Sequence, residues 1–379
     1  MVAADVRDAP GGWSAEDSVD ELAQLATTAG VEVVGRLIQK MTAPAKTHYI
    51  GKGKLDELLA AKNETEYDVV IFDDELSPLQ QRNLEGLLKV KVIDRSALIL
   101  DIFARRAHTR EGQLQVELAQ HEYLLPRLVG QWSHLERLGG GIGTRGPGES
   151  QLETDRRLIR KKIQRLKKEI ESVKKHRALH RGRRQKLGIP VVALVGYTNA
   201  GKSTLLNALT EADTFVEDKL FATLDPTTRR ITLPNHSRVL LTDTVGFIRK
   251  LPPAIITAFR ATLEEINEAS VLLHVVDLSS HNAAEQCETV EETIKDLNLS
   301  DKPRITVLNK IDRLIGHDIP DCGEKEAIDY LSNQCYPGEE NILPISAVKK
   351  WGLTRMLEQL ELILAQNNSL ANPTYNNAV

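Results

Sequence analysis

An apolar run that ends in a glycine-rich turn is the feature that most constrains this chain. The run IPVVALV spans Ile189–Val195 and is followed at once by GYTNAGKS, from Gly196 to Ser203. A GxxxxGKS sequence between a buried strand and a helix is typical of a phosphate-binding loop. Its backbone amides and the following helix N-terminus form a cradle for phosphate groups. We therefore predict an α/β domain that binds a nucleotide at this turn.

Chemical roles follow for the polar side chains of this loop. Lys202 is expected to reach the β- and γ-phosphates, and the Ser203 hydroxyl is expected to bind Mg²⁺. The predicted contacts are Gly196, Tyr197, Thr198, Asn199, Ala200, Gly201, Lys202 and Ser203. By itself this motif also fits an ATPase, so the base must be identified elsewhere in the chain.

A second motif follows the predicted strand RVLLTD. The residues Asp243, Thr244, Val245 and Gly246 form a DxxG sequence, and all four are assigned to the nucleotide site. Such a motif places an acid near the metal and a glycine amide near the γ-phosphate, where it triggers an order–disorder switch. We therefore assign Gly246 a catalytic role beside Lys202.

Two further strand ends point to guanine. RITVLNKID ends in Asn309, Lys310 and Asp312, and ILPISA carries Ser346 and Ala347. An aspartate there can accept both N1–H and the 2-amino hydrogen of guanine, a pattern that adenine lacks. Lys310 can lie across the base, Asn309 can brace the loop, and the Ser346–Ala347 backbone can donate to guanine O6. The neighbouring Val348 is included in the site. Four motifs in this order predict that the nucleotide is GTP.

The segment FATLDPTTR supplies the second switch. Thr223, Thr227 and Thr228 are candidates to close on Mg²⁺ and the γ-phosphate. The predicted contacts from this segment are Phe221, Ala222, Thr223, Leu224 and Asp225.

Phe247 occupies the position after DxxG, where Ras-like proteins carry a glutamine that orients the attacking water. An apolar ring cannot do this. Either Phe247 packs inward while another residue acts, or intrinsic hydrolysis is slow and a partner completes the site in trans. We favour the second interpretation.

A small α/β domain is expected before the nucleotide domain. Residues 1–13 are predicted to be irregular and residues 14–110 to alternate helices with mainly parallel strands. The expected strands are VEVVGRLI, DVVIFD and KVKVID. Helices are expected from a capping box at Ser18–Glu21 to Gly30, from near Leu55, from Ser77–Pro78, and over 96–106.

Residues 111–187 are predicted to form an antiparallel helical hairpin. Apolar residues recur at spacings of 3 and 4 from Leu114 to Leu135, with a kink at Pro126, and again from Ile159 to Val173. A capping box at Ser150 is expected to start the second helix. The joining loop, 139–150, is glycine-rich and longer than the about 2–5 residues such a hairpin needs, which favours a functional tip. The nucleotide domain is assigned to 188–366 and a flexible tail to 367–379.

Charge is distributed unevenly. The segment 156–187 carries a net charge of +13, whereas the whole chain carries −4. A basic element on an acidic body indicates an anionic polymer as partner, and RNA contact is favoured over a merely solvated face.

These motifs together resemble the HflX family of GTPases. The resemblance covers nearly the whole chain and includes YIGKGKLDEL from Tyr49, GGGIGTRGPGESQLETDRR from Gly139, and the FATLDPT and DTVGFI segments. It implies a family-specific N-terminal domain, a helical hairpin and a P-loop GTPase domain. It also implies that Ser203 and Thr223 bind Mg²⁺, and that a hydrophobic residue at Phe247 is usual. The expected partner is the large ribosomal subunit, with the hairpin tip directed at the peptidyl-transferase centre and stalled or stressed ribosomes being split.

Composition narrows the alternatives. Three cysteines without a CxxC pair and the lack of a long apolar run predict a cytoplasmic protein with no membrane span. We expect it to act as a monomer. Two rival functions are a GTP-gated regulator of protein partners and an ATP- or GTP-driven RNA remodeller. Salt-sensitive affinity for ribosomal particles would argue against the first, and the lack of a second GxxxxGK sequence argues against the second.

Overall fold

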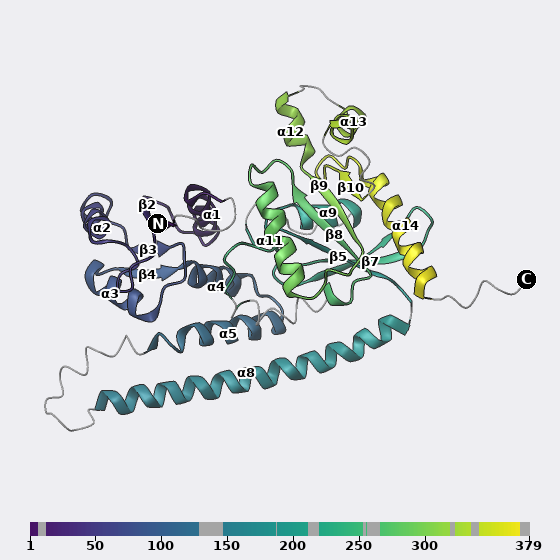
Figure 1. Ribbon diagram of the computed structural model, residues 1–379. Helices are drawn as coiled ribbons and strands as arrows, with labels where there is room; N and C mark the ends of the chain where they lie inside the picture. Colours follow the sequence, from purple (N-terminus) through teal and green to yellow (C-terminus); the bar gives the residue numbers. More distant parts are fainter. Residues whose placement is uncertain are drawn as a thin grey trace, which may run out of the picture. The chain divides into compact units, whose positions relative to one another are not determined.

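The computed structural model describes residues 1–6, 13–128, 147–186, 188–210, 220–252, 255, 266–318, 323–334 and 341–371. The chain divides into two compact units (Figure 1). Unit 1 comprises residues 1–176 and 250–259, and unit 2 comprises residues 177–249 and 260–379. The domain limits given above stay predictions.

A four-stranded parallel sheet with the order β2-β1-β3-β4 forms the centre of unit 1. Its strands are β1 (Val2–Val6), β2 (Leu37–Met41), β3 (Val69–Phe72) and β4 (Lys91–Asp94). The described helices are α1 (Ala15–Thr28), α2 (Lys52–Thr65), α3 (Pro78–Leu88), α4 (Arg95–Arg106), α5 (Arg110–Leu124) and the long α8 (Pro147–Lys186), of which residues 147–176 belong to this unit. The expected small α/β arrangement with a parallel sheet is confirmed.

The beginning of the chain differs from expectation. Residues 2–6 form an inner strand rather than an irregular segment, and Val2 is fully buried between two neighbouring strands. Helix α1 starts at Ala15, because the Ser14 side chain accepts the Asp17 amide at 3.0 Å. Ser18 therefore lies inside the helix, and the predicted cap there is wrong.

The starts of strand β2 and of helix α3 can also be compared with the prediction. Strand β2 begins only at Leu37, so the first six residues of the predicted strand VEVVGRLI have no regular structure. The start of α3 agrees with the prediction, because Ser77 caps the helix, Pro78 follows it, and Gln80 completes a capping box.

Helices α5 and α8 pack through one apolar seam. Leu114 and Leu118 of α5 are buried against Ile163, Leu166 and Ile170 of α8. This seam confirms the predicted pairing of the two heptad patterns.

Ion pairs show that the two helices run antiparallel. Arg110 pairs with Glu169 at 3.0 Å, and Glu117, further along α5, pairs with the earlier Lys162 at 2.7 Å. In Figure 1, α5 and α8 accordingly lie side by side.

The ends of both helices correct the prediction. Helix α5 ends at Leu124, so Pro126 follows the helix instead of kinking it. Helix α8 begins at Pro147 and not after a cap at Ser150, and its 40 residues give a length of about 60 Å. Residues 129–146, which include most of the predicted tip loop, lie outside the described residues.

A six-stranded sheet forms unit 2, in the order β10-β9-β8-β5-β7-β6. All neighbouring strands are parallel except the edge strand β6, which is antiparallel to β7. The strands are β5 (Val191–Gly196), β6 (Thr227–Thr232), β7 (Arg238–Asp243), β8 (Val271–Asp277), β9 (Arg304–Asn309) and β10 (Ile342–Pro344). The helices are α9 (Lys202–Thr210), α11 (Ala283–Asp296), α12 (Ile311–Asp318), α13 (Glu324–Gln334) and α14 (Leu353–Ala371).

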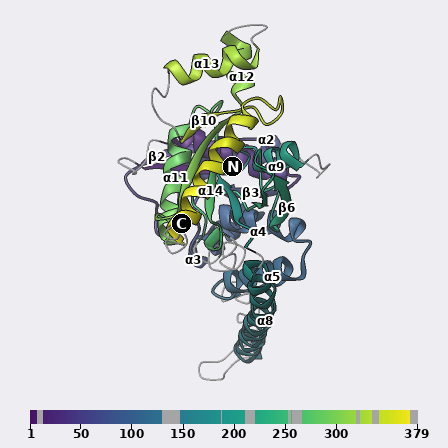
Figure 2. The ribbon, with the colours of Figure 1, turned by 90° about the vertical axis from the view of Figure 1, so that its right-hand side faces the viewer.

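Helices cover both faces of this sheet. Val192 and Leu194 of β5 join one core with residues of α9 and α14. The alternate residues Ala193 and Val195 point to the other face and are also fully buried. Figure 2 shows α9 and α11 on opposite sides of the strands. Strand ends, rather than strand faces, are therefore left to form a site. None of the described helices is long and apolar enough to span a membrane.

Candidate nucleotide-binding site

The loop between β5 and α9 is shaped by one close approach. Gly201 has a φ of +95°, and a Cβ atom on it would lie 2.2 Å from the Asn309 side-chain nitrogen. Only glycine fits there. The chain then enters α9 at Lys202, so the loop amides and the helix start face the same space.

Lys202 is the buried cation of this loop. Its Nζ donates to the Tyr197 carbonyl at 2.7 Å and to the Gly196 carbonyl at 3.1 Å. Burial lowers the pKa of Lys202 to about 8; nearby Lys310 also lowers it, whereas Asp243 opposes the shift. A phosphate group at this point would stabilise the charged form.

Three oxygen-bearing side chains meet beside the loop. The Ser203 and Thr223 hydroxyls lie 2.8 Å apart, and both donate to Asp243 Oδ2, at 2.7 and 2.9 Å. The other carboxylate oxygen, Asp243 Oδ1, is buried without a hydrogen-bond partner, and burial raises the pKa of this acid. Hard oxygen donors around an unsatisfied carboxylate are the ligand chemistry that Mg²⁺ prefers.

The geometry of the site separates the three threonine candidates of the second switch segment. Thr223 lies at Ser203, whereas Thr228 pairs with Thr242 across β6 and β7 at 3.0 Å. Thr227 also lies in β6. Thr223 is thus the candidate that the fold brings to Ser203 and Asp243. Phe221 is tied to the phosphate loop because its amide donates to Thr198 Oγ1 at 2.9 Å.

Phe247 packs inward, with 3% of its surface exposed. Its amide donates to the Gly196 carbonyl at 3.0 Å, and its carbonyl accepts the Thr198 amide at 2.7 Å. These bonds attach the segment after DxxG to the phosphate loop.

The opposite end of the site is organised by Asn309. Its side-chain amide donates to the Ala200 carbonyl at 2.9 Å, and its oxygen accepts the Ala347 amide at 3.0 Å. It therefore braces the phosphate loop against the Ser346–Ala347 loop. Asp312 accepts the Ser346 hydroxyl at 2.6 Å, which fixes the carboxylate at this end.

Lys310 is held by an ion pair with an acid that lies outside the sequence motifs. Its Nζ lies 2.6 Å from Asp277 Oδ2, at the end of the neighbouring strand β8. The other Asp277 oxygen accepts the Ser279 amide and hydroxyl, at 3.0 and 2.6 Å. Asp277 is thereby oriented to hold the Lys310 stem in place.

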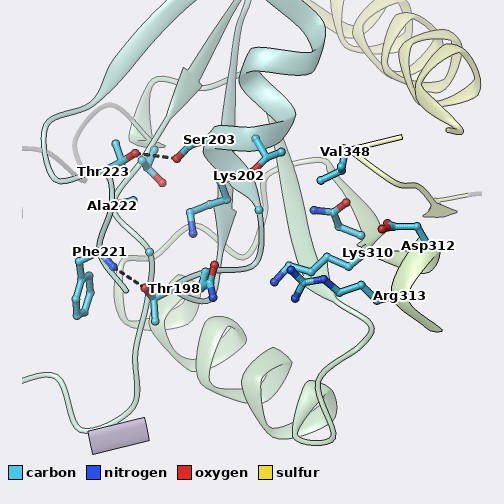
Figure 3. A pocket seen from close by; sticks show the side chains of 16 residues that line it. Thr198, Lys202, Ser203, Phe221, Ala222, Thr223, Lys310, Asp312, Arg313 and Val348 are labelled. Atoms are coloured by element: carbon cyan, nitrogen blue, oxygen red, sulfur yellow. Dashed lines mark hydrogen bonds between the residues drawn. The ribbon is translucent and has the colours of Figure 1, made fainter. Parts of the chain in front are cut away.

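A cavity of about 240 Å³ joins the two ends. Figure 3 shows Lys202, Ser203 and Thr223 at one end and Lys310, Asp312, Arg313 and Val348 at the other. The predicted residues that line it are Thr198, Asn199, Gly201, Lys202, Ser203, Phe221, Ala222, Thr223, Thr244, Gly246, Asn309, Lys310, Asp312 and Val348.

The remaining predicted residues are not part of the lining. They are Gly196, Tyr197, Ala200, Leu224, Asp225, Asp243, Val245, Ser346 and Ala347. Several of these support the lining from behind, as the bonds of Asp243, Ser346 and Ala347 show. Sequence reasoning missed Thr204 and Arg313, which also line the cavity. Each directly follows a motif, so extending each motif by one residue could have found them.

Strand-end motifs, a phosphate loop and an aspartate at the far end of the cavity, all on one mainly parallel sheet, define a P-loop GTPase. Family models agree along the chain: residues 16–104 match "GTP-binding GTPase N-terminal", 106–184 "GTP-binding GTPase Middle Region", and 191–310 "50S ribosome-binding GTPase". A further model, "Elongation factor Tu GTP binding domain", matches residues 261–366.

Curated relatives agree with the family models and match over most of the chain. The "GTPase HflX" of Caldanaerobacter subterraneus is 54% identical over 346 residues, covering 91% of this chain and 77% of that protein. The Escherichia coli "GTPase HflX" is 49% identical over 298 residues, covering 79% of this chain and 70% of that protein. The chain belongs to the HflX family of GTPases, and it hydrolyses GTP.

Among solved structures, a GTP-binding protein from Sulfolobus solfataricus in complex with GDP matches with a TM-score of 0.46 and 27% identity. That match covers 97% of this chain and 99% of the other.

Proposed function

We propose that this GTPase binds the large ribosomal subunit through α8, is stimulated by it, and splits or rescues stalled ribosomes, acting as a monomer. The matched model described as a 50S ribosome-binding GTPase supports a ribosomal partner. The observation that carries the proposal is the arrangement of positive charge on α8.

Four cations form one face of this helix, which we call the cationic face: Arg157, Lys161, Lys168 and Lys175. At about 100° per residue their directions fall within about 40° of one another. All four are exposed, and no ion pair joins any of them to a described residue. Aligned charges without acidic partners repel one another, so a polyanion would stabilise them.

The cationic face is directed away from the hairpin seam. Ile163, Leu166 and Ile170 are buried against α5 and lie roughly 180–240° around the helix from Arg157. The helix therefore uses one side for packing and leaves the other for a partner. A row of cations about 27 Å long matches the phosphate backbone of a structured RNA better than a compact protein surface.

The site supports a magnesium-dependent hydrolysis. Ser203 and Thr223 would hold Mg²⁺, with Asp243 beside them, because its orphaned oxygen and the two hydroxyls suit a hard cation. When bound, the ion neutralises charge on the phosphates. Lys202 would bind the β- and γ-phosphates, and the Gly246 amide would contact the γ-phosphate, while Asn309, Asp312, Ser346 and Ala347 select guanine.

Hydrolysis is expected to need a group supplied in trans. Among the described residues that line the cavity there is no glutamine, histidine or glutamate, and the one aspartate, Asp312, lies at the guanine end. Phe247 is apolar and buried. A partner that completes such a site can accelerate GTP hydrolysis by up to about 10⁵-fold.

The glycine-rich tip, 139–150, is the segment that we expect to enter a ribosomal cavity. Residues 139–146 lie outside the described residues, so this part of the proposal rests on the sequence. Arg145 can pair with phosphate or stack on an unpaired base.

Sedimentation with purified ribosomal subunits tests the proposal. We expect co-sedimentation with the large subunit in a non-hydrolysable GTP analogue, weaker binding in GDP, and splitting of intact ribosomes in GTP. A loop-shortened variant, with 140–148 replaced by three residues, should still bind GTP but fail to split. Equal recovery with either subunit in every nucleotide would contradict the proposal and favour an RNA remodeller or a protein-directed regulator.

A further inference from the structure

Thr198 of the phosphate loop is bonded to two other segments of the nucleotide site. Its hydroxyl accepts the Phe221 amide at 2.9 Å, and its own amide donates to the Phe247 carbonyl at 2.7 Å. All three residues belong to unit 2 and are buried. Figure 3 shows the bond from Phe221 to Thr198 and the bond between Ser203 and Thr223. Of the two bonds that Thr198 makes, a substitution can remove only the one to its hydroxyl.

Phe221 has a backbone conformation that its neighbours must hold. Its φ is +55°, in the left-handed region that residues other than glycine adopt at a cost in free energy. Phe221 is 2% exposed and Leu224 is also buried, whereas Ala222 and Thr223 line the cavity. Packing therefore fixes the apolar residues of this segment, and the Thr198 hydroxyl fixes the Phe221 backbone.

Thr223 lies only two residues after this bond. Its hydroxyl is 2.8 Å from Ser203 Oγ and donates to Asp243 Oδ2 at 2.9 Å. Because two residues of chain span at most about 7 Å, a shift of the Phe221 backbone must move Thr223 as well. The position of the Thr223 hydroxyl thus depends on the bond between Phe221 and Thr198.

We propose that Thr198 is a positioning residue for GTP hydrolysis, which holds the Thr223 hydroxyl where it would bind Mg²⁺. Thr198 acts through Phe221 and needs no contact with the ion. When the Phe221 amide loses this acceptor, other conformations of residues 221–225 become populated. The apparent affinity for Mg²⁺ then falls by the fraction of molecules that still present Thr223. This inference rests on the proposed role of Thr223 as a magnesium ligand, and it does not depend on a ribosomal partner.

Two substitutions at Thr198 test the role of its hydroxyl. Thr198→Val removes the acceptor and keeps the branched shape, whereas Thr198→Ser keeps the hydroxyl. The measured quantity is the Mg²⁺ concentration that half-maximally slows release of a fluorescent non-hydrolysable GTP analogue. We expect it to rise about fivefold in Thr198→Val, an effect of the size that one hydrogen bond gives, and to stay near the wild-type value in Thr198→Ser.

Three further measurements show whether the effect is specific. Affinity for GDP without Mg²⁺ should not change in Thr198→Val, since the phosphate-loop amides are retained. Single-turnover hydrolysis should slow at limiting Mg²⁺ and recover at saturating Mg²⁺. Thermal unfolding checks that each variant is folded. Thr293→Val, which removes a hydroxyl that is bonded within α11, is the matched control and should alter none of these values.

A double-variant cycle separates this proposal from the role of Thr223 itself. If Thr198 acts through Thr223, Thr198→Val adds nothing to the effect of Thr223→Ala on the half-saturating Mg²⁺ concentration. Additive effects would overturn the proposal, and so would an effect of Thr223→Ala without one of Thr198→Val. A wild-type value in Thr223→Ala would contradict the magnesium assignment of Thr223 and this proposal together.

Discussion

Asp312 is the single carboxylate that we propose determines the choice of base. Its position is fixed by the Ser346 hydroxyl at 2.6 Å, and the Asn309 brace joins the two loops that flank it. We propose that this acid, held by these neighbours, selects the base through its hydrogen-bond pattern. Asp277 likewise fixes the position of Lys310 through their ion pair.

Asp312→Asn should exchange guanine for xanthine. The amide can donate to the xanthine 2-oxygen while accepting from N1–H, but it repels the guanine 2-amino group. We expect GTP affinity to fall and xanthosine triphosphate affinity to rise, with a combined change on the order of 10⁴. A binding titration with both nucleotides measures it, and a variant that keeps full GTP affinity would disprove the assignment.

His274 gives unit 2 a pH-dependent stability. Burial lowers its pKa to about 4, with contributions from Arg304 and Lys202. The unfolded chain binds the proton near pH 6.5, so stability is complete above that pH and is lost as pH falls from about 6.5 to 4. The loss should reach roughly 3 kcal/mol.

Chemical denaturation of His274→Gln between pH 7 and 4 tests this. The variant should show a shallower loss of stability than the wild type, whereas the exposed control His236→Gln should retain the full pH dependence. Identical pH profiles for wild type and His274→Gln would mean that other groups cause the acid sensitivity.

At the scale of helices and strands, the sequence predicts the features that depend on residues close together in the chain. The phosphate loop, the Ser77 cap and the α5–α8 seam follow from spacing and from residue type, and the structure contains all three. What depends on tertiary contact could not be predicted. Strand β1 is short and contains two alanines, so only its pairing with β2 and β3 makes it a strand. The ion pair between Lys310 and Asp277 and the ion pair between Lys250 and Asp73 each join segments that are far apart in sequence. No local pattern indicates either pair.

The cationic face of α8 should set the salt dependence of ribosome binding. Reversing Arg157, Lys161, Lys168 and Lys175 to glutamate removes four phosphate contacts, so the slope of log affinity against log salt should become shallower by about three to four units. Nucleotide affinity should not change. Reversing four exposed acids elsewhere, Glu64, Glu288, Glu292 and Glu358, to lysine is the control. An unchanged slope in the α8 variant would show that this face only contacts solvent.

At the scale of the whole molecule, the nucleotide site and the cationic face of α8 belong to one proposed mechanism. Among the described residues, those that line the nucleotide site of unit 2 include no glutamine, histidine or glutamate, and α8 carries the exposed cations that we propose contact RNA. A GTPase that hydrolyses GTP slowly alone and quickly on its partner would consume GTP only where the partner is present. This coupling is the central claim.

Single-turnover GTP hydrolysis, measured with and without purified large ribosomal subunits, tests that claim most directly. We predict slow hydrolysis by the isolated protein and an acceleration of at least about 10²-fold by large subunits, within the range that groups supplied in trans can give. Lys202→Ala should abolish both rates, and small subunits should have no effect. Fast hydrolysis by the isolated protein, unchanged when large subunits are added, would contradict the account.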